Sequence, residues 1–171
     1  MGTSGPDVLP GTPGKDVLCG LGGNDVIYGD EGDDVIRGGK GHDRMFGGAG
    51  DDMIDGGPGN DTAFGNNGDD RLFGRHGRDR IRGNAGKDKL MGQDGNDGLV
   101  GGGGKDRVQG GMGHDRLTGG GASDQLNAGP GRDLLLARDS RRDVVSGGRH
   151  RDKARIDTRL DRLRQVEVVL R

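Results

Sequence analysis

The chain has 171 residues, of which 41 are glycine, only 27% are hydrophobic and 32% are charged. This composition is typical of disordered chains, because little apolar surface is available to offset the conformational entropy lost on folding. The net charge of −2 conceals an asymmetry: residues 1–70 carry 14 acidic and 4 basic side chains (−10), and residues 71–171 carry 14 and 22 (+8). With one Tyr and three Phe, the basic half lacks stacking platforms for bases, and no nucleic-acid partner is expected.

A nine-residue repeat overrides this composition. Between residues 2 and 136 an Asp occurs at every ninth position, an apolar residue follows it two places later, and Gly precedes it by two places except where Ala122 stands. Such a short fixed period predicts a stacked array in which every unit repeats one structural element. The repeated aspartates are Asp7, Asp16, Asp25, Asp34, Asp43, Asp52, Asp61, Asp70, Asp79, Asp88, Asp97, Asp106, Asp115, Asp124 and Asp133.

Numbered from its first Gly, the unit reads G-G-x-G-x-D-x-U-x, as in GGKGHDRMF at residues 38–46. This pattern resembles the calcium-binding nonapeptide of the RTX family, and the resemblance extends from residue 2 to about residue 155. Residues 11–29 further resemble small secreted haemolysin-type calcium-binding proteins of Gram-positive bacteria. The resemblance implies a secreted, extracellular bacterial protein, because the exterior of the cell supplies the calcium that folds such repeats.

Within each unit, positions seven to nine alternate outward, inward and outward, which predicts a short strand with one buried face. The preceding G-G-x-G-x-D segment predicts a turn, with the glycines at positions one and four adopting positive φ. Two units then form one right-handed coil of 18 residues, so odd and even units contribute to different sheets. The predicted fold is an all-β, right-handed parallel β-roll over residues 2–155, with about seventeen units and about eight coils.

The regular pattern weakens toward the C-terminus, where residues 138–155 form two degenerate units around Asp143 and Asp152. Ala128 replaces a first Gly, Ala137 reads as an inserted residue, and both last turns are expected to have lost their metal ions. In residues 156–171, Ile156, Thr158 and Leu160 alternate with polar residues, as do Val166, Val168 and Leu170. This alternation predicts two strands that cap the open end of the roll.

The position-six aspartates are the candidate metal ligands. Residues 18 apart lie in neighbouring coils, and calcium prefers six to eight hard oxygen ligands in a tolerant geometry, whereas magnesium requires a tight octahedron. The family resemblance implies that each ion is held between one unit and the next unit but one, by these carboxylates and by carbonyls of the glycine-rich turn. Seven interfaces among odd units and six among even units allow up to about thirteen calcium ions in the regular region.

An outward row of aromatic side chains stands apart from the metal pattern. Tyr28, Phe46 and Phe64 occupy position nine of successive odd units, and the predicted fold places them in a ladder on one face. Two interpretations remain open. The rings pack on one another and stabilise the sheet, or they form a contact surface for a partner.

No catalytic residues are expected, because the sequence contains no G-x-S-x-G elbow and no phosphate-binding loop. The single cysteine, Cys19, excludes a disulfide within the chain, and no apolar run is long enough to cross a membrane. The sequence therefore favours a secreted, monomeric, non-enzymatic module that binds calcium and folds upon binding it. Two alternatives are the repeat region of a larger exported toxin, protease or lipase, and a binder of polysaccharide or protein at a cell surface.

Overall fold

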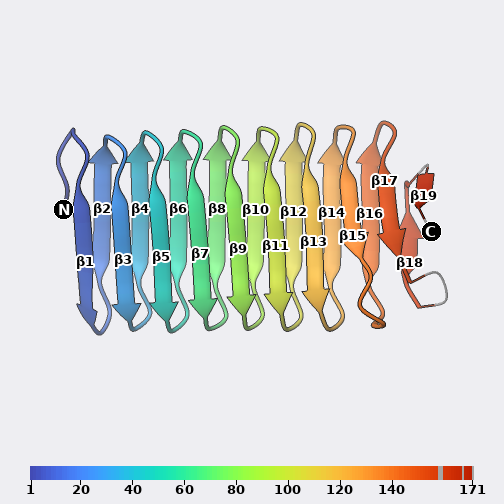
Figure 1. Ribbon diagram of the computed structural model, residues 1–171, viewed down its shortest axis with the longest axis horizontal. Helices are drawn as coiled ribbons and strands as arrows, with labels where there is room; N and C mark the ends of the chain where they lie inside the picture. Colours follow the sequence, from blue (N-terminus) through green and yellow to red (C-terminus); the bar gives the residue numbers. More distant parts are fainter. Residues whose placement is uncertain (158–159, 167, 171) are drawn as a thin grey trace.

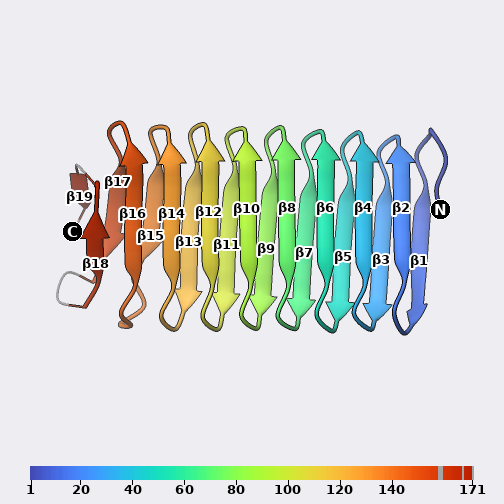
Figure 2. The ribbon, with the colours of Figure 1, turned by 180° about the vertical axis from the view of Figure 1, so that it is seen from behind.

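A computed structural model describes residues 1–157, 160–166 and 168–170, and these form a rod with the two termini at opposite ends (Figure 1). Two parallel sheets lie back to back along the rod. The odd-numbered strands face the viewer in Figure 1, and the even-numbered strands face the viewer in Figure 2. The chain crosses from one sheet to the other after every strand.

The strands in the described residues divide into a ten-stranded and a nine-stranded sheet. The first contains β1 (Val8–Pro13), β3 (Val26–Glu31), β5 (Arg44–Ala49), β7 (Thr62–Asn67), β9 (Arg80–Ala85), β11 (Gly98–Gly103), β13 (Arg116–Gly121), β15 (Leu134–Ala137), β17 (Lys153–Ile156) and β19 (Val168–Leu170). The second contains β2 (Val17–Gly22), β4 (Val35–Lys40), β6 (Met53–Pro58), β8 (Arg71–His76), β10 (Lys89–Asp94), β12 (Arg107–Met112), β14 (Gln125–Pro130), β16 (Val144–Arg149) and β18 (Arg162–Arg164).

The register confirms the predicted coil of 18 residues. Ile27 of β3 pairs with Met45 of β5, and Ile36 of β4 pairs with Ile54 of β6, each 18 residues further along the chain. Every strand therefore repeats the same positions of the unit directly above those of the strand below. The fold is a parallel β-solenoid in which odd and even units separate into the two sheets, as the repeat predicted.

The strands are longer than the sequence suggested, because they include the first three positions of the following unit. In β5 the sequence RMFGGA has the burial order exposed, buried, intermediate, buried, intermediate, exposed. Three residues of each unit consequently point inward: the Asp at position six, the apolar residue at position eight and the Gly at position one. The turn between strands is reduced to positions four to six.

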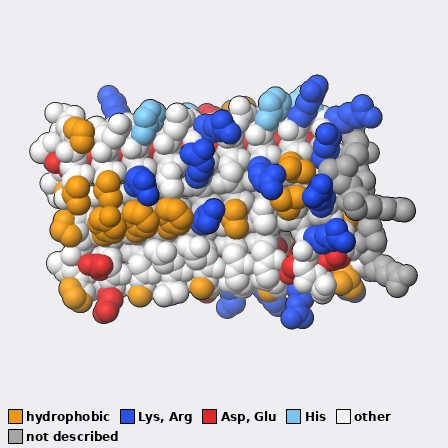
Figure 3. Space-filling model, in the orientation of Figure 1, with side chains coloured by type: hydrophobic (Ala, Val, Ile, Leu, Met, Phe, Trp, Pro, Cys, Tyr) orange, Lys and Arg blue, Asp and Glu red, His pale blue; other side chains and the backbone are white. Residues whose placement is uncertain are grey.

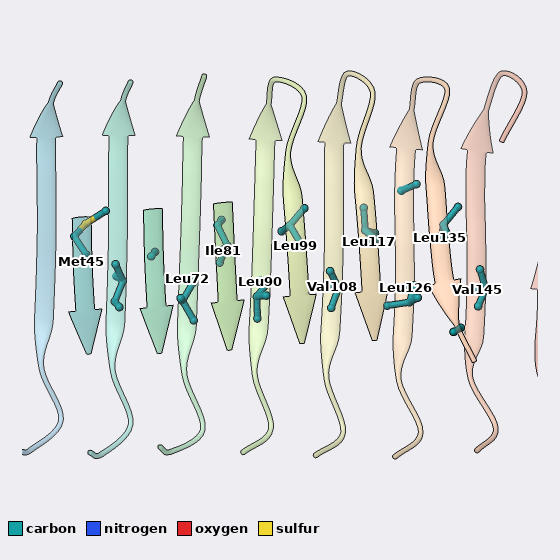
Figure 4. Packing of buried hydrophobic residues seen from close by; sticks show 14 of the residues in the cluster. Met45, Leu72, Ile81, Leu90, Leu99, Val108, Leu117, Leu126, Leu135 and Val145 are labelled. Carbon is teal, nitrogen blue, oxygen red and sulfur yellow. The ribbon is translucent and has the colours of Figure 1, made fainter. Parts of the chain in front are cut away.

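The hydrophobic core is a single rank of position-eight side chains along the rod axis (Figure 4). Ile36, Met45 and Leu72, for example, are completely buried between the two sheets. Because each coil contributes only two such side chains, the apolar core is one layer thick. Its stability therefore depends on every coil being stacked against its neighbours.

Positive φ occurs at positions two and four, and the prediction for position one was wrong. In the unit at residues 38–46, Gly39 and Gly41 have φ values of 107° and 131°, whereas Gly38 at position one lies in the strand. Four successive units that lack the second Gly adopt the same conformation at a cost in backbone strain. These residues are Asn66, Arg75, Asn84 and Gln93, with φ values of 82°, 84°, 80° and 78°.

The roll continues beyond its expected end. Ala137 is not an insertion, because it pairs with Ile156 and is buried at the position-one place, so the extra residue falls in the turn at 138–142. The strand expected through Leu160 is wrong: Leu160 lies in a turn, and Thr158 lies outside the described residues. Instead β18 pairs with β16, and β19, within the expected second strand, pairs with β17. The C-terminal segment thus extends both sheets in parallel.

Truncation after Arg155 should destabilise the calcium-saturated protein. The shorter chain loses β18 and β19 and exposes the backbone of β16 and β17, an unprotected edge that recruits other chains. We expect a fall in the melting temperature on the order of 5–10 °C and association in size-exclusion chromatography, given that about 1 kcal/mol corresponds to roughly 2–4 °C in a chain of this length. A truncated chain that stays monomeric with an unchanged melting temperature would contradict this role.

Candidate metal centres

The position-six aspartates form two buried columns, one in each series of turns. Those from the second coil onward are at most 3% exposed, whereas Asp7 and Asp16 of the first coil are half-buried. Carboxylates are among the groups least often buried without a partner. The buried members are Asp25, Asp34, Asp43, Asp52, Asp61, Asp70, Asp79, Asp88, Asp97, Asp106, Asp115, Asp124, Asp133, Asp143 and Asp152.

Within each column, one carboxylate oxygen is used to connect adjacent coils. The backbone N–H of Asp43 donates to Oδ1 of Asp61 at 2.8 Å, and the N–H of Asp61 donates to Oδ1 of Asp79 at 2.8 Å. The same bond links every pair of position-six aspartates from Asp7 and Asp16 to Asp152 and Asp143, at 2.7–3.0 Å. The structure thus brings together the carboxylates that the sequence placed two units apart.

The second carboxylate oxygen has no hydrogen-bond partner. Oδ2 is buried and unsatisfied in all fifteen aspartates from Asp25 to Asp152. Leaving one such acceptor buried costs about 1–3 kcal/mol, and more when it carries charge. A repeated orphaned oxygen of this kind indicates a place where a cation supplies the missing interaction.

Glycine at position one makes room for this oxygen. A Cβ on Gly47 would overlap Oδ2 of Asp52 and would lie 2.7 Å from the carbonyl oxygen of Gly65, the equivalent glycine two units on. The same crowding recurs at Gly38, where the Gly56 carbonyl oxygen would be 2.7 Å away. The first Gly of the motif is therefore required by space, and it leaves a carboxylate and a carbonyl oxygen facing one bare cradle.

Burial raises the pKa of these carboxyl groups far above the ordinary value for Asp. The pKa of Asp61 and Asp70 rises to about 7, chiefly through desolvation, with the neighbouring carboxylates of the column adding to the rise and a backbone N–H opposing it. The pKa of Asp52 rises to about 6 for the same reasons, with Asp33 and Asp51 among the charges that repel it. The metal-free columns thus hold their negative charge at an energetic cost that a bound cation would remove.

The donor set consists of oxygen atoms, most of which must come from the backbone. In the part of the chain that the structure describes, no group of three or more His, Cys, Asp or Glu side chains is close enough to hold a metal ion alone. A site here would combine carboxylates of one column with carbonyls of the glycine-rich turns. Such a set fits a hard cation with many oxygen ligands, and it does not fit zinc, which prefers nitrogen and sulfur.

Position five carries a second, exposed ladder that the sequence only partly suggested. Oδ1 of Asp33 accepts the backbone N–H of Asp51 at 2.9 Å, and Oδ1 of Asp51 accepts that of Asp69 at 2.8 Å. In the odd turns, Nδ1 of His42 accepts the N–H of Asn60 at 2.8 Å. His42 is thus a surface residue, as expected from its distance from other histidines, but it also connects two turns.

Comparison with protein families now identifies the repeat. A model of the RTX calcium-binding nonapeptide repeat matches four times, at residues 1–36, 28–63, 64–99 and 100–135. The chain belongs to this family. RTX repeats bind calcium, and the RTX β-roll is a structural calcium-binding fold. Comparison with curated proteins finds no match.

The structure adds residues to the RTX columns that the sequence had discounted. Asp143 and Asp152 are fully buried, accept the N–H groups of Asp124 and Asp133, and have an orphaned Oδ2 like the others. Asp161 accepts the N–H of Asp143 at 3.0 Å. The available signal was the recurrence of Asp before an alternating strand, which the lost glycines obscured. Position one holds an alanine in the preceding units, so the cradle there is narrower.

The aromatic ladder lies on the odd-numbered sheet, in the row of apolar side chains that crosses the N-terminal half of Figure 3. The rings of Tyr28 and Phe46 stack with centroids 5.1 Å apart, and those of Phe46 and Phe64 with centroids 5.2 Å apart. Face-to-face stacking covers the inner ring faces and leaves mainly their edges exposed. The rings therefore pack on one another, and a contact surface for a partner remains a hypothesis. Within the described residues, no helix has the length and apolarity needed to span a membrane.

Replacement of Gly47 by Ala should weaken the roll because the new methyl group overlaps Asp52. Overpacking of this kind costs about 1–3 kcal/mol, and we expect the melting temperature in saturating calcium to fall by roughly 3–10 °C. Gly103→Ala is the matched control, since a Cβ there would be 3.8 Å from its nearest neighbour. Equal melting temperatures for the two variants would show that position one is not constrained by the carboxylate.

Acidification should stabilise the metal-free roll. The folded pKa of Asp61, Asp70 and Asp106 is about 7, above the value of about 3.9 for an unfolded Asp. A raised folded pKa means that the folded state binds the proton more tightly, so stability is gained as the pH falls from about 7 toward about 4 and is lost as it rises through 7. In EDTA, the circular dichroism signal of β-structure should be larger near pH 5 than near pH 8.

Calcium should reverse this response, because protons and calcium compete for the same carboxylates. The calcium concentration at half-folding should increase as the pH is lowered over the same range. An identical pH dependence with and without calcium would contradict the assignment of the raised pKa values to the metal-binding carboxylates.

Proposed function

We propose that the chain is a secreted, non-enzymatic module that folds when calcium enters its two columns of position-six aspartates. The observation that carries the proposal is the orphaned, buried Oδ2 repeated in fifteen successive turns. Mutual repulsion of these carboxylates opposes folding without a cation, and the thin apolar core offers little to offset it. Metal binding would then supply much of the folding free energy, as in other small metal-dependent domains.

Each proposed site lies between two position-six aspartates of one column. Asp52 and Asp70 would hold one ion, with turn carbonyls completing the oxygen ligands, and Asp70 would also contribute to the next site. The regular region contains thirteen such pairs, and the pairs Asp124 with Asp143 and Asp133 with Asp152 raise the proposed maximum to fifteen. Because neighbouring sites share an aspartate, calcium should bind cooperatively.

Calcium dependence supports an extracellular location. A chain that requires abundant calcium stays unfolded where calcium is scarce, as in the cytoplasm, and folds after export. The calcium-loaded roll then serves as a rigid rod, and this physical role needs no catalytic group.

A pair of neighbouring substitutions tests the proposed ligands. Asp70→Asn removes a position-six carboxylate, whereas Asp69→Asn removes an adjacent exposed charge and keeps the oxygen that accepts the N–H of Lys87 at 2.8 Å. We expect EDTA to abolish most β-structure and calcium in the millimolar range to restore it cooperatively. Asp70→Asn should raise the calcium midpoint on the order of tenfold, because carboxylate number sets calcium affinity, and Asp69→Asn should change it much less.

Magnesium at the same concentration is the metal control and should restore little structure. Retention of the full β-signal in EDTA would refute calcium-dependent folding. Equal shifts for Asp69→Asn and Asp70→Asn would refute the assignment of position six as the ligand.

A further inference from the structure

A row of exposed cations lies on the turns before β8, β10 and β12 and on the first residues of these strands. Arg71, Lys87, Lys89, Lys105 and Arg107 line a groove of about 410 Å³. Ser123 and Gln125 extend it with neutral polar groups. Neither the calcium columns nor the hydrophobic core requires positive charge at these places.

Most of these cations have no partner within the described residues. Lys87 lies 3.9 Å from Asp69, and no carboxylate of the described chain forms an ion pair with Arg71, Lys89, Lys105 or Arg107. The position-six carboxylates that reach the groove are buried and are the proposed calcium ligands. With these neutralised by calcium, five cations and the single exposed carboxylate of Asp69 leave four net positive charges.

The row follows the axis of the roll. Arg71 is the register partner of Lys89, and Lys89 is the register partner of Arg107, so like charges stand side by side on three adjacent strands. Neighbouring strands are about 4.8 Å apart, and like charges directly opposite one another destabilise a sheet. A ligand with acid groups repeated along an extended chain would match this spacing and relieve the repulsion.

The charge of the groove changes along the rod. The N-terminal turns of the same column carry Asp33, Asp51 and Asp69 at position five, whereas the next two turns carry Lys87 and Lys105. An anionic ligand would therefore be confined to about three coils. None of the residues lining the groove is aromatic, which disfavours nucleic acid because bases bind largely by stacking.

We propose that this groove binds an acidic polysaccharide, a chain of uronic acids whose carboxylates pair with the cation row. The planar guanidinium groups of Arg71 and Arg107 suit a carboxylate because they can donate two parallel hydrogen bonds to it. Ser123 and Gln125 can hydrogen-bond the sugar hydroxyls. The inference rests on the calcium-folded roll of the proposed function, because only the coiled chain brings these cations together.

The test compares two triple variants with the same change in charge. Lys89→Gln, Lys105→Gln and Arg107→Gln together alter the groove. Arg78→Gln, Arg80→Gln and Arg116→Gln alter one position-five and two position-seven residues of the opposite column and sheet. Binding of a short oligogalacturonate in saturating calcium is measured by calorimetry, and circular dichroism of each sample reports folding.

We expect the groove variant to lose at least about tenfold in affinity, because several charge-assisted bonds are removed together, and the control variant to lose less than about twofold. Added salt should weaken binding by the unmodified chain. Equal losses in the two variants, or no binding by a chain that circular dichroism shows to be folded, would overturn the inference and leave the proposed function intact.

Two further probes test the identity of the ligand. Tighter binding of heparin than of oligogalacturonate would overturn the choice of a carboxylate, and tighter binding of single-stranded DNA would overturn the choice of a polysaccharide. Binding of neutral dextran equal to that of oligogalacturonate would overturn the role of charge. A chain that shows no calcium-dependent folding would overturn the proposed function and, with it, this inference.

Discussion

The structure depends on a carboxylate oxygen that is buried without a partner in every turn. Oδ1 of each position-six Asp ties its coil to the one before it, and Oδ2 remains free for a cation. The pKa values of about 6 to 7 express the cost of this arrangement in the absence of metal. The same residue therefore builds the stack and prevents the stack from being stable alone, which makes folding responsive to calcium.

The glycines and the thin core follow from that carboxylate. Position one must lack a side chain so that Asp52, and its equivalents, can turn inward beside the backbone. The space between the sheets is then filled by one rank of side chains such as Met45 and Leu72. A core of this size cannot offset the entropy of a glycine-rich chain, so cations at the turns complete the stabilisation that apolar packing begins.

Outward positions are free of these constraints, and the halves of the rod differ there. The N-terminal half displays the stacked rings of Tyr28, Phe46 and Phe64 together with exposed carboxylates. Lys and Arg side chains are spread over the C-terminal half (Figure 3). Because a solenoid repeats its backbone, substitutions at positions five and seven change the surface without changing the fold. The cation row on β8, β10 and β12 is a product of this freedom.

The nine-residue period by itself determined the coil, the division into two sheets, the inward apolar rank and the aspartate columns, because a strict repeat leaves one way to stack. Tertiary structure decided the rest. The reason for Gly47 at position one, the orphaned Oδ2 and the burial of Asp143 all depend on contacts between residues 18 or 19 apart, which no single unit contains. The end of the roll likewise could not be read from residues 138–171, since pairing with β16 and β17, rather than local pattern, places their strands.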